Sequence, residues 1–143
     1  MTTASGEGGI RCLLVRAGEY RCAVPLNQVR RVVASLATHP LPNAAPELLG
    51  LAEFGGEPLP VLELARLVGA PEGAASPHPV TVVAWAGPPR ERELVGLAAD
   101  QALSIVEVPV GSLAGGQAGL VSGEALVDGA PVRVLNLEHL GAA

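Results

Sequence analysis

An internal repeat constrains the fold of this chain more than any other feature. Residues 50–67 align without a gap with residues 123–140, at an offset of 73 residues. Eight positions are identical: Gly50/Gly123, Ala52/Ala125, Gly56/Gly129, Pro58/Pro131, Val61/Val134, Leu62/Leu135, Leu64/Leu137 and Leu67/Leu140. A repeat of this kind indicates that the fold is built from a duplicated unit.

Each copy of the repeat predicts a β-hairpin that runs into a short helical turn. Gly56 and Gly129 lie between two apolar runs, where a tight turn with positive φ costs glycine little. The second runs, residues 59–64 and 132–137, are short and aliphatic, which favours strands over helices. We therefore expect equivalent buried positions in the two copies, among them Val61/Val134 and Leu62/Leu135.

The repeat extends over most of the chain. Residues 24–33 fall on residues 97–106 at the same offset, and residues 12–18 resemble residues 81–87 at an offset of 69. The difference in offset belongs in the loops, where changes of length are tolerated. The pattern predicts two similar five-stranded units, about ten strands in total.

The domain organisation follows from this pattern. We expect one domain over residues 10–140, with subdomain repeats at about 10–68 and 80–140, and the repeats leave open whether strands are exchanged between them. A length of 143 residues suits one compact unit. Residues 1–9 are small and polar, which predicts a flexible tail.

Three loops separate the predicted strands, at residues 36–49, 69–79 and 111–119. The first contains three prolines and is interpreted as a rigid connection, although an extended ligand segment is the alternative. The second is a flexible linker between the two repeat units. The third is rich in glycine and alanine and corresponds to the proline-containing loop of the first unit.

The charge and hydropathy of the chain exclude several classes of function. The net charge is −5, and all nine basic residues are arginine. Without a basic cluster, nucleic acid and an anionic membrane are not expected as partners. The absence of lysine excludes Schiff-base chemistry and the phosphate-binding P-loop. No apolar run approaches membrane-spanning length and no signal peptide is recognisable, which predicts a cytoplasmic protein without membrane insertion.

The two cysteines are predicted to be buried, reduced and structural. Cys12 and Cys22 lie on the two arms of a hairpin whose two-residue loop is either Ala17-Gly18 or Gly18-Glu19. Strand alternation then places the two side chains on opposite faces, where a disulfide is geometrically poor. No metal-binding spacing of cysteine and histidine occurs.

No catalytic motif is recognisable, so the sequence predicts neither an enzyme nor a cofactor or metal site. His39 and His78 precede prolines in loops, and His139 lies near the C-terminus. The motifs Gly-x-Ser-x-Gly, His-Glu-x-x-His and Gly-x-Gly-x-x-Gly do not occur in the sequence.

Three glutamates on one hairpin offer the main alternative to this interpretation. Glu53, Glu57 and Glu63 could form an acid/base pair. Their counterparts in the second copy are Leu126, Ala130 and Asn136, so the repeated scaffold does not require acids there. We interpret them as a solvated hairpin edge.

Short motifs in a fixed order resemble the CheW-like adaptor domain of bacterial chemotaxis. The resemblance covers about residues 10–140. In the first half it rests on Val24-Pro25-Leu26, Val29-Arg30-Arg31-Val32, Leu49-Gly50-Leu51-Ala52 and Leu59-Pro60-Val61-Leu62-Glu63-Leu64, and in the second half on residues 95–100 and 122–137.

The resemblance implies an all-β fold of two pseudo-repeated, five-stranded SH3-like β-barrels, packed around a shared core and carrying short helical turns. It implies a non-catalytic adaptor that couples the cytoplasmic tip of a chemoreceptor to the regulatory domain of a histidine kinase. Receptor contacts are then expected between the barrels and kinase contacts at the barrel ends. The isolated protein is expected to be monomeric. The alternatives are a sensor that binds a peptide or small molecule between the barrels, and an enzyme with Cys12 or Cys22 as nucleophile.

The resemblance places the receptor-facing groove at Val29, Arg31, Gly50, Glu53, Phe54 and Gly55. Two of these residues depart from the family pattern, which usually has arginine at the position of Gly55 and glutamate at that of Arg31. The two changes either compensate each other or mark a member with different partner specificity. Phe54 either anchors a partner or packs the hairpin, as its counterpart Val127 suggests.

Overall fold

The structure is a computed structural model that describes residues 9–69, 78–109 and 120–140. Most of the predicted tail and linker, and the whole predicted loop at 111–119, lie outside the described residues. The strands are β1 (Gly9–Ala17), β2 (Tyr20–Pro25), β3 (Val29–Ala34), β4 (Leu48–Phe54), β5 (Glu57–Glu63), β6 (Val80–Ala86), β7 (Glu93–Ala99), β8 (Gln101–Pro109), β9 (Val121–Val127) and β10 (Ala130–Leu135). Three short helical turns are η1 (Leu26–Gln28), α2 (Leu64–Leu67) and η3 (Leu137–His139).

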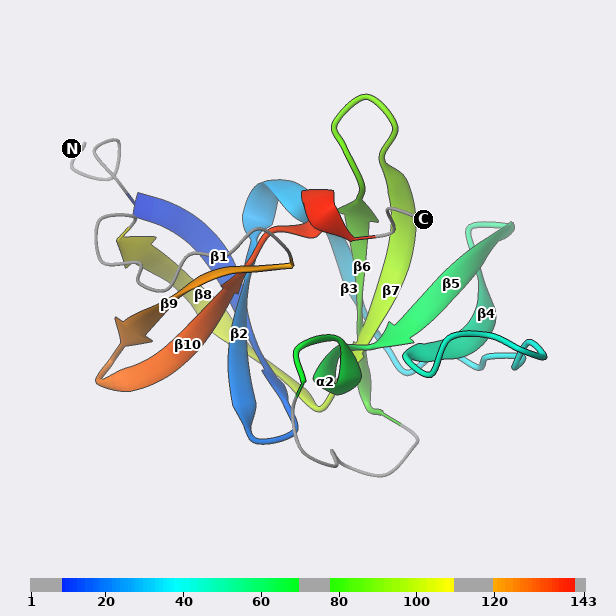
Figure 1. The fold of residues 1–143 in the computed structure, drawn as a ribbon, viewed down its shortest axis with the longest axis horizontal. Helices are drawn as coiled ribbons and strands as arrows, with labels where there is room; N and C mark the ends of the chain where they lie inside the picture. The colour runs from blue at the N-terminus through cyan, green and yellow to red at the C-terminus, as the bar shows by residue number, and fades with distance from the viewer. Residues whose placement is uncertain (1–8, 70–77, 110–119, 141–143) are drawn as a thin grey trace.

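The strands form two five-stranded sheets, side by side in Figure 1. Sheet A has the order β8-β1-β2-β10-β9, and sheet B has the order β3-β6-β7-β5-β4. Strands β1–β5 come from the first repeat and β6–β10 from the second, so each sheet takes two strands from one repeat and three from the other. Strands at the same place in the two orders are repeat counterparts. The predicted all-β fold with two SH3-like units is confirmed.

The repeated hairpins have the same register, as their sequences predict. In β4–β5, Leu48 pairs with Leu62 and Phe54 with Glu57. In β9–β10, Val121 pairs with Leu135 and Val127 with Ala130, each 73 positions further on. Both hairpins contain an extra residue at the equivalent place, a β-bulge that bends the strand. Both end in a helical turn, α2 or η3.

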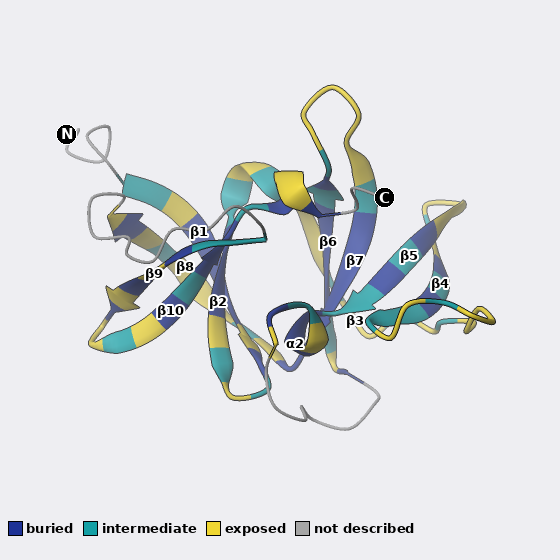
Figure 2. Cartoon of the chain, in the orientation of Figure 1, coloured by how far each residue is buried: buried dark blue, intermediate teal, exposed yellow. Residues whose placement is uncertain are grey.

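The largest apolar cluster lies between the two sheets and is shared by them. It contains Val24 of sheet A and Leu97 of sheet B, together with Leu64, Leu135 and Leu137 from the ends of the repeated hairpins. Each sheet also has a smaller cluster of its own. Each of β1, β2, β6 and β7 therefore contains a run of consecutive residues buried on both faces, dark blue in Figure 2.

The predicted core positions of the repeat lie in these clusters. Val61, Val134 and Leu135 are no more than 2% exposed, and Leu62 is half-buried against the shared core. The counterpart leucines therefore differ in burial, although their strands pair in the same register.

Candidate functional site

Closure of sheet B brings two predicted site residues together. Strands β3 and β4 are the two outer strands of this sheet. The Arg31 guanidinium carbon, on β3, nevertheless lies 6.0 Å from the centre of the Phe54 ring, on β4. This distance allows a cation–π contact. The positive charge at Arg31 thus lies near the ring of the residue that precedes the turn residue Gly55.

The remaining predicted site residues are distributed less simply. Glu53 and Gly55 are exposed and are the chain neighbours of Phe54, which contacts Arg31. Val29 instead packs against the shared core, because a bulge separates it from Arg31 on β3. The predicted residues therefore contribute a surface patch, which we call the Arg31 patch: Arg31, Glu53, Phe54 and Gly55.

Gly50, also on β4, does not belong to the exposed patch. It is buried, with φ +148°, and a Cβ atom there would lie 2.4 Å from the carbonyl oxygen of His39. His39 and Leu51 exchange two backbone hydrogen bonds of 2.8 and 3.0 Å, which hold the proline-containing loop against β4. Gly50 thus permits the close approach of two chain segments.

An open, apolar cavity of about 540 Å³ lies beside the Arg31 patch, at one end of sheet B. We call it the sheet B socket. Two of the chain's three aromatic residues, Phe54 and Trp85, line it, and Glu57 and Glu93 add negative charge. The Arg92 guanidinium lies 4.4 Å from the Trp85 ring centre. The other lining residues are Leu51, Pro58, Leu59, Pro60 and Leu94.

The repeat counterpart of this socket on sheet A is lined by more charged residues, namely Glu19, Arg21, Glu124 and Arg133. It has a volume of about 370 Å³, and Pro131 and Arg133 occupy the positions of Pro58 and Pro60. The Arg133 guanidinium carbon lies 3.8 Å from the centre of the Tyr20 ring. Arg133 Nη1 also donates a 2.7 Å hydrogen bond to the Val68 carbonyl oxygen. The two repeats therefore have cavities at equivalent places, and the one on sheet A is the more highly charged.

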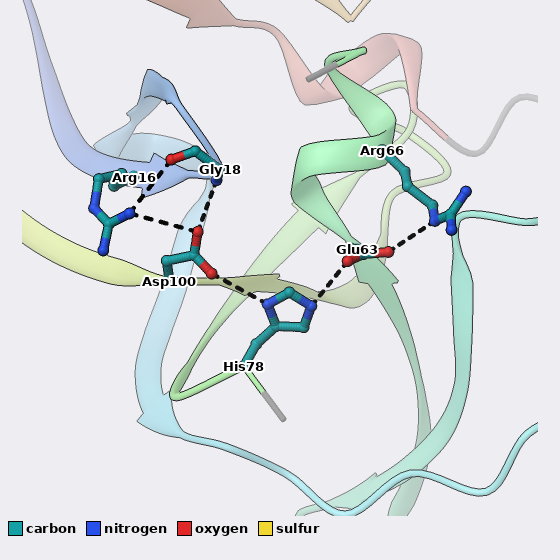
Figure 3. A network of polar contacts seen from close by, with 6 residues as sticks. All are labelled: Arg16, Gly18, Glu63, Arg66, His78 and Asp100. Atoms are coloured by element: carbon teal, nitrogen blue, oxygen red, sulfur yellow. Dashed lines mark hydrogen bonds and ion pairs between the residues drawn. The ribbon is translucent and has the colours of Figure 1, made fainter. Parts of the chain in front are cut away.

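A buried polar network that the sequence analysis did not predict links the two sheets (Figure 3). His78 lies between two carboxylates, with Nε2 3.0 Å from Glu63 Oε2 and Nδ1 3.4 Å from Asp100 Oδ1. The solvated-edge interpretation was wrong for Glu63, whose side chain is only 14% exposed. Glu53 and Glu57 are exposed, as that interpretation requires.

No metal centre is found in the described part of the chain. No cluster of three or more histidine, cysteine or acidic residues could hold a metal ion there. The described helices include none that is long and apolar enough to span a membrane.

The cysteines have the environment expected of structural thiols. Cys12 packs in the cluster of sheet A and Cys22 in the shared core, so their side chains lie on opposite faces, and both are free. The hairpin loop is Gly18-Glu19. Burial raises the pKa of the Cys12 thiol to about 11. Burial also raises the pKa of Cys22 to about 12, although the positive charge of Arg133 acts in the opposite direction.

We predict that neither thiol reacts in the folded protein near neutral pH. The thiolate is the reactive form, and a raised pKa makes it scarce. A chromogenic disulfide reagent should therefore titrate two thiols after unfolding and almost none before. The mass of the protein under non-reducing conditions should correspond to two free thiols. Rapid reaction of one native thiol would restore the cysteine-nucleophile hypothesis.

Comparison with known proteins agrees with the resemblance in fold and sequence. The family model described as the CheW-like domain matches residues 11–143. Protein FrzA of Myxococcus xanthus is 30% identical over 98 residues, which cover 68% of this chain and 59% of FrzA. The chain thus matches less than two thirds of that relative. The crystal structure of the scaffolding protein TtCheW from Thermoanaerobacter tengcongensis superposes with a TM-score of 0.75 at 16% identity, covering 94% of this chain and 93% of that one. The chain belongs to the CheW-like domain family.

Proposed function

We propose that this protein is a non-catalytic, cytoplasmic adaptor that couples a chemoreceptor tip to the regulatory domain of a histidine kinase. Family membership supports the proposal, as does the description of the structural relative TtCheW as a scaffolding protein. Within this chain, the sheet B socket is the observation that supports a role in docking other proteins. An open apolar cavity lined by tryptophan and phenylalanine is typical of a protein-docking surface, whereas a small-molecule sensor needs a more enclosed pocket.

The Arg31 patch is the proposed receptor-facing surface, and the sheet B socket is the proposed kinase-docking surface. The two surfaces meet at Phe54, whose ring contacts the Arg31 guanidinium and also lines the socket. A partner that displaces the Arg31 side chain would therefore change the wall of the neighbouring cavity. This adjacency gives the adaptor a direct route for coupling its two partners. The isolated protein is proposed to be monomeric.

A crossed binding experiment tests this assignment. Arg31→Glu should weaken binding to this protein's own receptor tip, because it reverses the charge of the patch and removes the cation–π contact. High salt should reduce the difference. Trp85→Ala should weaken binding to the kinase regulatory domain by about 2 kcal/mol, as loss of a buried aromatic anchor does. Trp85→Ala should bind the receptor tip as wild type does, whereas Arg31→Glu, which removes the contact on the Phe54 ring, should change kinase binding less than Trp85→Ala does.

Matched variants control for charge and for position. Arg30→Glu makes the same charge change at an exposed neighbour on β3 and should leave receptor binding nearly unchanged. Tyr20→Ala removes the aromatic residue of the sheet A cavity and should not affect the kinase contact. Equal binding by wild type and all variants would show that these surfaces are not the docking sites.

A double variant tests the departure from the family pattern. Arg31→Glu combined with Gly55→Arg restores the usual residues and should improve binding to a typical receptor tip. Gly55 has φ +60°, so arginine there adds strain of about 1 kcal/mol. Its counterpart Asp128 adopts φ +53°, which shows that this turn accommodates a side chain. Gly55→Ala controls for the strain without adding charge.

A further inference from the structure

His78 occupies the centre of an alternating chain of charges between the two sheets. Its side chain is 4% exposed, and the Asp100 side chain is 5% exposed. On one side, Asp100 Oδ2 accepts a 2.7 Å hydrogen bond from the Gly18 N–H and lies 3.7 Å from Arg16 Nη1. On the other side, Glu63 Oε1 accepts a 2.9 Å hydrogen bond from Arg66 Nε.

This chain of contacts connects separate elements of the fold. Gly18 belongs to the turn between β1 and β2 in sheet A. Glu63 ends β5 in sheet B, and Arg66 lies on α2. Asp100 is the residue at which the chain passes from β7 in sheet B to β8 in sheet A. The imidazole ring therefore joins the β1–β2 turn to the end of β5 across the boundary between the sheets (Figure 3).

The chemistry of imidazole makes this connection depend on protons. A neutral ring has one N–H donor and one nitrogen lone pair, whereas an ionised carboxylate only accepts hydrogen bonds. With both carboxylates ionised, a neutral ring can satisfy only one of them and presents its lone pair to the other. Only the doubly protonated ring donates to Glu63 and Asp100 at once. Arg16 and Arg66 are the other charged groups that contact these carboxylates among the described residues.

The repeat counterpart of this junction contains no charge. Asn136 and Asn27 occupy the positions of Glu63 and Asp100. There, Gln28 Nε2 donates a 3.2 Å hydrogen bond to Asn136 Oδ1, and the Leu137 N–H donates a 3.0 Å hydrogen bond to Gln28 Oε1. Amides keep their donors and acceptors at every physiological pH. One fold thus contains a neutral junction and a charged junction at equivalent places.

We infer that the contact of His78 with Glu63 and Asp100 is a proton-operated junction between the two sheets, which is closed when both ring nitrogens carry protons. Loss of one proton removes one of the two hydrogen bonds and so uncouples Asp100, with the β1–β2 turn bonded to it, from the end of β5. The contact between the sheets at His78 then depends on pH, whereas the contact at Gln28 does not. This inference does not rest on the adaptor role.

The test compares the unfolding equilibrium of wild type and His78→Gln between about pH 5.5 and pH 8.5. Glutamine occupies similar space but cannot gain a proton. At the lower pH the substitution should raise the unfolding equilibrium constant about tenfold, as loss of a charge-assisted hydrogen bond does. The difference should shrink as the pH rises. His39 and His139 are present in both proteins, so they contribute equally to both sides of the comparison.

Two further variants use the neutral junction as a standard. Gln28→Ala should destabilise the protein by an amount that does not change with pH. Glu63→Asn combined with Asp100→Asn replaces both carboxylates by the residues found at their repeat counterparts, and His78→Gln in that background should lose its pH-dependent effect. A His78→Gln effect that is independent of pH in the wild-type background would overturn the inference.

A measurement on the wild-type protein tests the inference without depending on whether a variant folds. Nitrogen NMR of the wild-type protein should show both His78 ring nitrogens protonated at about pH 5.5. When the ring becomes neutral, one of its two nitrogens should show the shift of an unprotonated imidazole nitrogen. A ring that carries a single proton throughout this range would contradict the inference.

Discussion

Replacing Leu135 with alanine is expected to lower the free energy of unfolding by about 2–5 kcal/mol. Leu135 is 1% exposed and belongs to the core that both sheets share. Its truncation removes buried methyl groups and leaves a cavity that neighbouring strands fill only in part. Because both sheets contribute to this core, the variant should still unfold in one transition, at lower denaturant concentration.

Two leucines provide controls for this prediction. Leu126 lies on the same hairpin but is 68% exposed, so Leu126→Ala should change stability by less than about 0.5 kcal/mol. Leu62, the repeat counterpart of Leu135, is half-buried and should give an intermediate loss. Chemical denaturation of the three variants measures the series. Equal effects at Leu135 and Leu126 would show that β10 does not contribute to the shared core.

Replacing Gly50 with alanine is expected to destabilise the protein by about 3 kcal/mol or more. The new Cβ atom would lie 2.4 Å from the His39 carbonyl oxygen, and alanine would have to adopt a φ of +148°. Both the steric contact and the unfavourable φ act on backbone that is held by the His39–Leu51 hydrogen bonds. The structure can relieve them only if the proline-containing loop moves.

Gly56 separates the two causes of this effect. It has φ +82°, but a Cβ atom there would meet nothing within 4 Å. Gly56→Ala therefore retains the conformational strain without the steric contact and should cost only about 1 kcal/mol. Thermal or chemical unfolding of the two variants gives the comparison. Equal losses would mean that the approach of His39 to Gly50 adds nothing to the energetic cost.

The hairpins of this protein could be predicted from sequence because their signals are local. Glycine marks the turns, short aliphatic runs mark the strands, and the duplication fixes the register twice. The exchange of strands could not be derived in the same way. Backbone hydrogen bonds are alike in every pairing. The sequences of β1 and β2 therefore do not by themselves indicate that their further sheet partners come from the second repeat. Their apolar runs, such as 12–15, do indicate burial on both faces.

The candidate site was predictable only in part, for a related reason. The resemblance located Arg31 and Phe54, but their contact depends on closure of sheet B and cannot be inferred from strands at opposite edges. The contacts of His78 join residues 15 and 22 positions away in the sequence. Its neighbouring proline suggested a loop, and nothing local indicated burial. Long-range polar contacts of this kind depend on the packing of complete sheets.

The exchange of strands also has a consequence for synthesis of the chain on the ribosome. When the first repeat has been made, β1 and β2 still lack β8, β9 and β10, while β3, β4 and β5 still lack β6 and β7. The N-terminal half of a growing chain therefore has no complete sheet to fold into. Unpaired strand edges and apolar surface remain exposed until the second half emerges, at about 5–20 residues per second, and during that interval the nascent chain depends on protection from aggregation.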